Sequence, residues 1–241
     1  MRIPRVFTEQ TLVSGAVIEL EADAAHHLSK VLRMQAGREL VLFNGKGGEF
    51  TGSIHEVTKK NVTVLVAEYR ADNRESPLVL ELAIGVSRGD RFDYVLQKAT
   101  ELGVTKITPL ITERTEVRMG GERQDKLMER WQQIIVSACE QCQRNLLPEL
   151  TAPVQIIDWL PQANAELRFV LHHRDSQKLP AEQQPQSVVL LVGPEGGLSD
   201  DEIAQAQAQN FNALTLGPRV LRTETAPLAA ISLVQYLWGD F

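Results

Sequence analysis

The 241-residue chain is predicted to be an α/β protein, in which a small β-barrel precedes a parallel sheet covered by helices. Short strand-like runs fill residues 1 to about 70, whereas strand and helix patterns alternate from residue 78 to the C-terminus. A polar stretch at 70–77, closed by Pro77, separates the two patterns and is the best linker candidate. We therefore predict two domains, at 1–72 and 73–241.

The N-terminal part alternates short strand-like runs with turns that are charged or rich in glycine, such as residues 44–48. One short helix fits residues 24–32. The predicted strands are 17–20, 39–43, 49–54 and 61–66. This spacing is typical of a small β-barrel.

The C-terminal part begins with a β-rich run and then alternates with helices. Its predicted strands are 78–86, 104–111, 168–171, 188–192 and 213–216. Helices are predicted at 91–102 and 124–144 and after each of the last two strands, because apolar residues recur there at helical spacing. Such alternation predicts a parallel sheet between layers of helices.

Composition restricts the class of protein. The hydrophobic content of 43% supports a real core, and the sequence contains neither an apolar run of the roughly 18 residues that a membrane span needs nor a signal peptide. We expect a soluble, cytoplasmic protein without a membrane partner. The net charge of -6 argues weakly against a nucleic-acid partner, but residues 1–70 carry nine basic against eight acidic side chains, so a local basic surface remains open.

The two cysteines, Cys139 and Cys142, form a single CxxC. That motif serves in zinc sites or redox chemistry when a second pair or a suitable fold accompanies it. Here it lies within a helical pattern without a second pair, which favours two small apolar side chains on neighbouring helix positions. We expect no metal, and the adjacent His172 and His173 also lack further ligands.

A glycine-rich loop at 193–197 follows the apolar strand at 188–192. Glycines permit a tight turn and a close approach of backbone to ligand. Ser199 and Glu202 form a capping-box pattern that predicts the start of the next helix. The loop lacks both GxGxxG and GxxxxGK[ST], so by itself it indicates either a cofactor loop or a tight turn without a ligand.

A second loop, at 216–226, places Arg219, Arg222 and Glu224 before a helix at 226–238. Arginine is suited to forked recognition of phosphate or of a developing oxyanion, and a nearby carboxylate can accept a proton. A solvated ion pair is the alternative for this pair, and Thr223 and Thr225 are candidate helix caps. Parallel strands bring both loops to one sheet edge, where open α/β sheets bind ligands.

Four segments resemble the ribosomal RNA small subunit methyltransferase E family of SPOUT methyltransferases. They are QKATELGV at 97–104, ACEQCQR at 138–144 with Pro148, GPEGG at 193–197 and LGPRVLRTETA at 216–226. The resemblance implies a PUA-like β-barrel that binds RNA, a parallel sheet with a trefoil knot, and a homodimer. It also implies S-adenosylmethionine as cofactor and N3 of a uridine in 16S rRNA of the small ribosomal subunit as target.

Residues are assigned by position within this resemblance, which spans nearly the whole chain, from 2–5 and 31–34 to the C-terminal helix. The cofactor is expected to contact Leu171, His172, Gly193, Pro194, Glu195, Gly196, Gly197, Leu216, Gly217, Leu221, Thr223 and Ala226. The chain reads His172-His173 where relatives often show His-Pro, which weakens the assignment of that loop. For RNA, the expected contacts are Arg2, Arg5, Lys30, Arg33, Lys59, Lys60, Arg114, Arg118 and Arg144. A solvated loop is the less favoured alternative for the polar segment at 112–123.

The chemistry then assigns roles. Methylation at N3 of uracil requires loss of the N3 proton, and the resulting charge spreads over two carbonyl oxygens. Arg222 is the expected charge-stabilising residue and Glu224 the candidate base. Two alternatives stay open: another SPOUT activity such as ribose 2'-O-methylation, and a noncatalytic RNA-binding protein of ribosome assembly.

Overall fold

The computed structural model describes residues 3–58, 61–172 and 179–241, and its contacts divide the chain into two units. The first unit contains Met1–Glu75 together with Cys139–Leu147, and the second contains Ser76–Ala138 with Pro148–Phe241. The first boundary falls slightly after the predicted residue 72. The return of Cys139–Leu147 to the first unit was not predicted, because nothing in a helical pattern shows which domain it contacts.

The first unit contains a five-stranded sheet in the order β1-β3-β4-β5-β2. Its strands are β1 (Arg5–Phe7), β2 (Val17–Glu19), β3 (Glu39–Phe43), β4 (Glu49–Val57) and β5 (Val62–Arg70). Strand β1 was not predicted; it pairs parallel with β3, while the other pairs are antiparallel. Helix α1 (Ala22–His26) and the π-helical turn η1 (His27–Val31) occupy the predicted helical region, and Leu28 is fully buried.

The second unit contains a parallel sheet in the order β12-β10-β11-β6-β7-β8, with β9 also paired to β7. Its strands are β6 (Val79–Gly85), β7 (Lys106–Ile111), β8 (Glu149–Leu150), β9 (Val154–Gln155), β10 (Leu167–Leu171), β11 (Ser187–Val192) and β12 (Asn212–Leu214). Every pair between them is parallel, as predicted. The two-residue strands β8 and β9 were not predicted.

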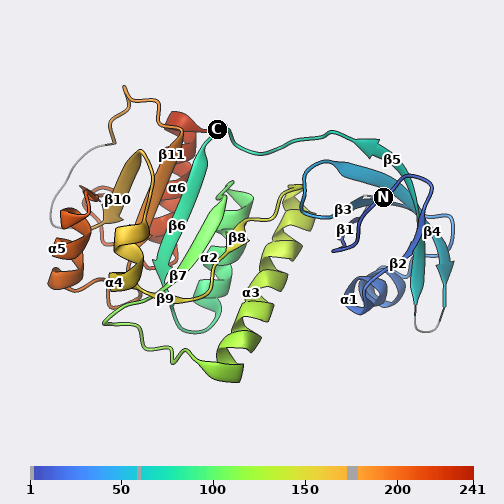
Figure 1. Cartoon of the computed structure of the whole chain (residues 1–241), viewed down its shortest axis with the longest axis horizontal. Coiled ribbons are helices and arrows are strands. Elements are labelled where there is room, and N and C mark those ends of the chain that lie inside the picture. Colours follow the sequence, from blue (N-terminus) through green and yellow to red (C-terminus); the bar gives the residue numbers. More distant parts are fainter. Residues whose placement is uncertain (1–2, 59–60, 173–178) are drawn as a thin grey trace. The chain divides into compact units, whose positions relative to one another are not determined.

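Helices cover both faces of this sheet (Figure 1). They are α2 (Asp90–Glu101), α3 (Gly121–Cys142), α4 (Ile156–Trp159) with the 3-10 turn η2 (Leu160–Gln162), α5 (Asp200–Ala208) and α6 (Thr225–Trp238). Val189 and Leu191 pack in one apolar cluster with residues of α4 and α5. Because side chains alternate along a strand, the buried Val188 and Leu190 face the opposite layer, where α6 contacts β11. No helix in the described part of the chain is long and apolar enough to cross a membrane.

The sheet order explains why distant loops meet. Strands β12, β10 and β11 are neighbours and parallel, so their carboxyl ends share one edge. The segments after them begin at His172, Gly193 and Thr215. These are the segments in which the sequence placed most of its cofactor residues. Strand order and register do not decide the trefoil knot, which stays a prediction.

Candidate functional site

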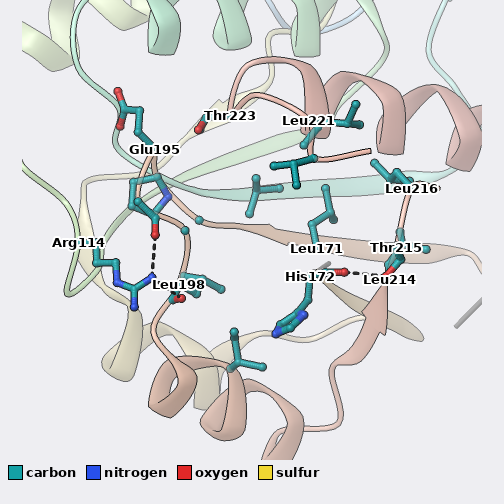
Figure 2. A pocket seen from close by; sticks show the side chains of 18 of the residues that line it. Arg114, Leu171, His172, Glu195, Leu198, Leu214, Thr215, Leu216, Leu221 and Thr223 are labelled. Carbon is teal, nitrogen blue, oxygen red and sulfur yellow. Dashed lines mark hydrogen bonds between the residues drawn. The ribbon is translucent and has the colours of Figure 1, made fainter. Parts of the chain in front are cut away.

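A cavity of about 360 Å³ lies at this edge of the sheet, between the segments that follow β10, β11 and β12 (Figure 2). All twelve residues predicted to contact the cofactor line it: Leu171, His172, Gly193, Pro194, Glu195, Gly196, Gly197, Leu216, Gly217, Leu221, Thr223 and Ala226. Other lining residues, which sequence reasoning did not assign to the cofactor, include Arg114, Leu198, Leu214 and Thr215. The fold thus brings the predicted set together.

The loop at 193–197 has a conformation that depends on glycine. A Cβ at Gly193 would lie 2.7 Å from the carbonyl carbon of Gly197 and from the nitrogen of Leu198, so the turn closes on itself there. Gly197 has a φ of 70°, in the left-handed region. Pro194 lies against the end of β6, because a Cβ at Gly85 would be 2.5 Å from its Cδ. The loop is therefore packed against the sheet.

The predicted capping box forms at the start of α5. The backbone N–H of Glu202 donates to the Ser199 hydroxyl at 3.3 Å, and the Ser199 N–H donates to the Glu202 carboxylate at 2.8 Å. The other carboxylate oxygen of the buried Glu202 accepts the Glu113 N–H at 2.8 Å. The Glu202 side chain therefore binds both the end of the glycine-loop segment, at Ser199, and the segment that follows β7, at Glu113.

Glu195 is bound to the start of the neighbouring α2 region. Its Oε1 accepts the Arg88 N–H at 2.9 Å and a guanidinium N–H of Arg91 at 3.2 Å. Partial burial acts to raise the pKa of Glu195, but hydrogen bonds from its own N–H, from Arg88 and from Arg91 outweigh it and lower the pKa. The carboxylate thus braces the loop as well as lining the cavity.

The strands β10 and β12 hold the second wall of the cavity. The His172 N–H donates to the Leu214 carbonyl at 3.1 Å. The Thr215 hydroxyl donates to the His172 carbonyl at 2.7 Å, the bond that Figure 2 marks. The backbone pairing of the two strands therefore continues past their ends. His173 lies outside the described residues.

The loop at 216–226 forms the third wall and leads into α6. Gly217 has a φ of 86°, and the Arg222 carbonyl accepts the N–H groups of Thr225 and Ala226 at 2.9 Å. Neither predicted catalytic side chain lines the cavity: Arg222 is exposed, and Glu224 occupies the N-cap of α6 without a side-chain cap bond. Thr223, between them, does line it. The expected threonine cap is therefore not formed.

The residues predicted to contact RNA differ in their exposure and in their contacts. Lys30 and Arg33 are exposed in the first unit, and Arg118 is exposed in the second. Arg114 instead donates to the carbonyls of the glycine loop. Arg2, Lys59 and Lys60 lie outside the described residues.

The structure corrects the prediction that Arg5 and Arg144 contact RNA directly. Both side chains are buried in ion pairs within the first unit. Arg5 pairs with Glu49 and donates to the Asn145 side-chain oxygen at 2.5 Å. Arg144 pairs with Glu75 at 2.5 Å. Their side chains are 7% and 5% exposed, which leaves little surface for phosphate. We therefore assign both a structural role.

The segment that contains the cysteines is also structural. Cys139 is buried, and its hydrogen bond with Cys142 together with burial raises the pKa of its thiol. Glu140 accepts the Phe7 N–H at 3.0 Å, and burial raises the pKa of its carboxyl despite that bond. Among the described residues, no group of three or more His, Cys, Asp or Glu side chains is placed to hold a metal ion.

Comparison with protein families finds two matches along the chain. Residues 74–235 match an RNA methyltransferase domain, and residues 20–67 match an RNA methyltransferase PUA domain. Ribosomal RNA small subunit methyltransferase E of Buchnera aphidicola (subspecies Schizaphis graminum) is 35% identical over 99% of the chain and 98% of its own length. The enzyme of the same name from Bacillus subtilis is 30% identical over 95% of the chain and 93% of its own length.

Two solved structures are similar over the full length of both chains. A putative methyltransferase from Legionella pneumophila, in complex with S-adenosylmethionine, is 45% identical with a TM-score of 0.96. A ribosomal RNA small subunit methyltransferase E from Neisseria gonorrhoeae, bound to S-adenosylmethionine, is 38% identical with a TM-score of 0.93. The predicted arrangement of a PUA-like unit before a parallel α/β sheet is confirmed by these matches.

Proposed function

Because the chain belongs to the family of ribosomal RNA small subunit methyltransferase E, we propose that it transfers a methyl group from S-adenosylmethionine to N3 of a uridine in 16S rRNA. The observation that carries the proposal is the convergence of twelve predicted residues on one cavity. They come from segments that are distant in sequence and meet only because β10, β11 and β12 are adjacent.

The cavity is suited to this cofactor in size and in chemistry. Its volume of about 360 Å³ lies in the range of small-molecule sites. Leucines 171, 198, 214, 216 and 221 provide an apolar wall for an adenine ring, while the glycine loop presents backbone to a polar ligand. When bound, S-adenosylmethionine supplies a methyl group that is already activated on sulfur. The protein then has to bind the cofactor and the uracil, orient them in line and remove the N3 proton.

We assign the treatment of the uracil to the loop before α6. The guanidinium of Arg222 would stabilise the charge on the uracil oxygens as the N3 proton leaves, and Glu224 is the candidate acceptor. Both residues are adjacent in sequence to Thr223, which lines the cavity, and we therefore assign them to its border. In this assignment the cofactor occupies the cavity and the target base binds at its border.

A homodimer would complete this border. The cavity is lined by Thr223 but not by Arg222 or Glu224 within a single chain. Helix α6, which follows these residues, exposes two large apolar side chains, Leu233 at 44% and Tyr236 at 71%. We propose that a second copy covers this helix, so that the border of the site is built at the contact between subunits.

RNA would be held by exposed cations of both units. Lys30 and Arg33 lie at the end of η1, and Arg118 lies in the segment between β7 and α3. Exposed cations of this kind give affinity through phosphate contacts and release of counterions.

The experiment is methyl transfer from labelled S-adenosylmethionine to small ribosomal subunits that lack the modification, followed by nucleoside analysis. We expect labelled N3-methyluridine in 16S rRNA. Labelled 2'-O-methylnucleoside instead would establish the alternative methylation. Absence of both products, together with absence of cofactor binding in calorimetry, would favour a noncatalytic RNA-binding protein.

A further inference from the structure

Arg114 makes contacts that differ from those expected of an RNA ligand. One of its terminal nitrogens donates to the Gly196 carbonyl at 2.8 Å and to the Leu198 carbonyl at 3.2 Å. Figure 2 shows the guanidinium beside the loop that carries Glu195, with the bond to the Gly196 carbonyl marked. The carbonyls of Gly196 and Leu198, in and directly after the glycine loop, are thereby bound to one cation.

The aliphatic part of the same side chain covers the loop. A Cβ at Gly196 would lie 3.1 Å from the Arg114 Cβ and 3.2 Å from its Cδ. That separation is tight for real side chains, so glycine at 196 lets the arginine stem lie directly on the loop. The side chain therefore combines a packing contact with two charge-assisted hydrogen bonds.

The backbone that carries Arg114 is fastened independently. The Thr112 N–H donates to the Thr115 hydroxyl at 2.9 Å, and the Thr115 N–H donates to the Thr112 carbonyl at 3.0 Å, which closes a turn around Arg114. The Glu113 N–H donates to the buried Glu202 at 2.8 Å. The turn after β7 is thus held by contacts that do not involve the Arg114 side chain.

From these contacts we propose that Arg114 is a positioning residue that fixes the glycine loop in its cofactor-binding conformation. The turn at 112–115, through Arg114, and the Ser199–Glu202 cap act as two supports of one loop. This inference rests on the proposed function, because it assigns the loop to S-adenosylmethionine. It replaces the phosphate contact that the sequence suggested for this residue.

The test compares two substitutions by calorimetry with S-adenosylmethionine in the absence of RNA. Arg114→Met keeps the aliphatic stem and removes the donors, so the dissociation constant should rise about tenfold or more, as expected for loss of a charge-assisted hydrogen bond. Arg114→Lys restores a single nitrogen with several hydrogens, which should recover most of that loss. Arg123→Met removes an exposed cation further along the chain and serves as the matched control.

The same variants are then compared in RNA binding and in methyl transfer. The proposal expects Arg114→Met to raise the KM for the cofactor while the affinity for RNA stays near that of the unsubstituted protein. An unchanged cofactor dissociation constant in Arg114→Met, with weakened RNA binding, would overturn it. If the unsubstituted protein fails to bind S-adenosylmethionine, the proposed function itself is wrong, which is a distinguishable result.

Discussion

The Arg144 guanidinium is joined to the Glu75 carboxylate, 69 residues earlier in the chain, by hydrogen bonds of its Nε and of a terminal nitrogen. The two side chains are 5% and 12% exposed. Removing one partner of such a buried pair leaves the other charge without compensation. We expect Arg144→Ala to lower the free energy of unfolding by about 3–5 kcal/mol. Urea unfolding measures this, with Arg118→Ala at an exposed site as the control; equal stability of the two variants would contradict a structural role.

Substitution of Gly193 and Gly217 should distinguish two effects of an added Cβ: steric overlap with backbone atoms and strain from a positive φ. Gly193→Ala places a Cβ against backbone atoms at 2.7 Å, so it should destabilise the protein by about 1–3 kcal/mol and weaken cofactor binding. Gly217 has no atom within 4 Å of an added Cβ but has a φ of 86°, so Gly217→Asn should be milder than Gly217→Ala. Asparagine at 193 should bring no such relief. Thermal unfolding and calorimetry with S-adenosylmethionine check both expectations.

Arg222→Ala should reduce methyl transfer far more than cofactor affinity. Loss of one charge-stabilising donor typically costs about 10²–10³ in kcat. Because Arg222 does not line the cavity, the dissociation constant for S-adenosylmethionine should stay near its original value. Single-turnover transfer to unmodified small subunits gives the rate, and calorimetry gives the affinity. Equal losses in the two measurements would show that Arg222 binds the cofactor.

Glu140 should make stability dependent on pH. Burial raises the pKa of its carboxyl in the folded protein, so folding favours the protonated form. The associated stability is fully present below the unfolded pKa and is lost as pH rises through the folded pKa. Glu140→Gln keeps an oxygen that can accept the Phe7 N–H but does not titrate. We therefore expect the variant to gain stability relative to the original protein as pH rises above about 4.5. A constant difference across that range in urea unfolding would contradict the assignment.

Lys30 and Arg33 should contribute affinity for RNA without contributing to methyl-transfer chemistry. Both are exposed near the end of η1, so the double variant Lys30→Ala/Arg33→Ala should fold normally and bind RNA more weakly. Removal of each cation that touches a phosphate should reduce the slope of log affinity against log salt by about one. Affinity measured at several salt concentrations tests this. An unchanged slope would place the RNA surface elsewhere.

Patterns that are local in the sequence predicted much of the fold. The uniformly apolar run at 188–192 became the central strand β11, and Ser199 and Glu202 formed their capping box. The βα alternation predicted a parallel sheet but not its strand order, and the observed order places the loops after β10, β11 and β12 at one edge. The cofactor residues were assigned through the family motifs, and the fold gathered all of them at one cavity.

What the sequence could not reveal depends on contacts between distant residues. Three arginines have the same side chain but different partners. Arg5 pairs with Glu49 and Arg144 with Glu75, whereas Arg114 donates to the carbonyls of Gly196 and Leu198. Strands β8 and β9 have only two residues each, so their pairing with β7 rather than their own pattern defines them. A single cation or a short strand carries no periodic signal that distinguishes these outcomes.

The return of Cys139–Leu147 to the first unit determines how the chain can be divided. A fragment that ends at Glu75 would keep all five strands of the first sheet but would lack Glu140, Arg144 and Asn145. Glu75 and the Phe7 N–H would then be without these partners, and Arg5 would lose Asn145 while keeping Glu49. The PUA-like unit is therefore not a separable module in the linear sense: its last structural piece is synthesised only after the chain has begun the second sheet, so its fold cannot be complete before part of its neighbour has been made.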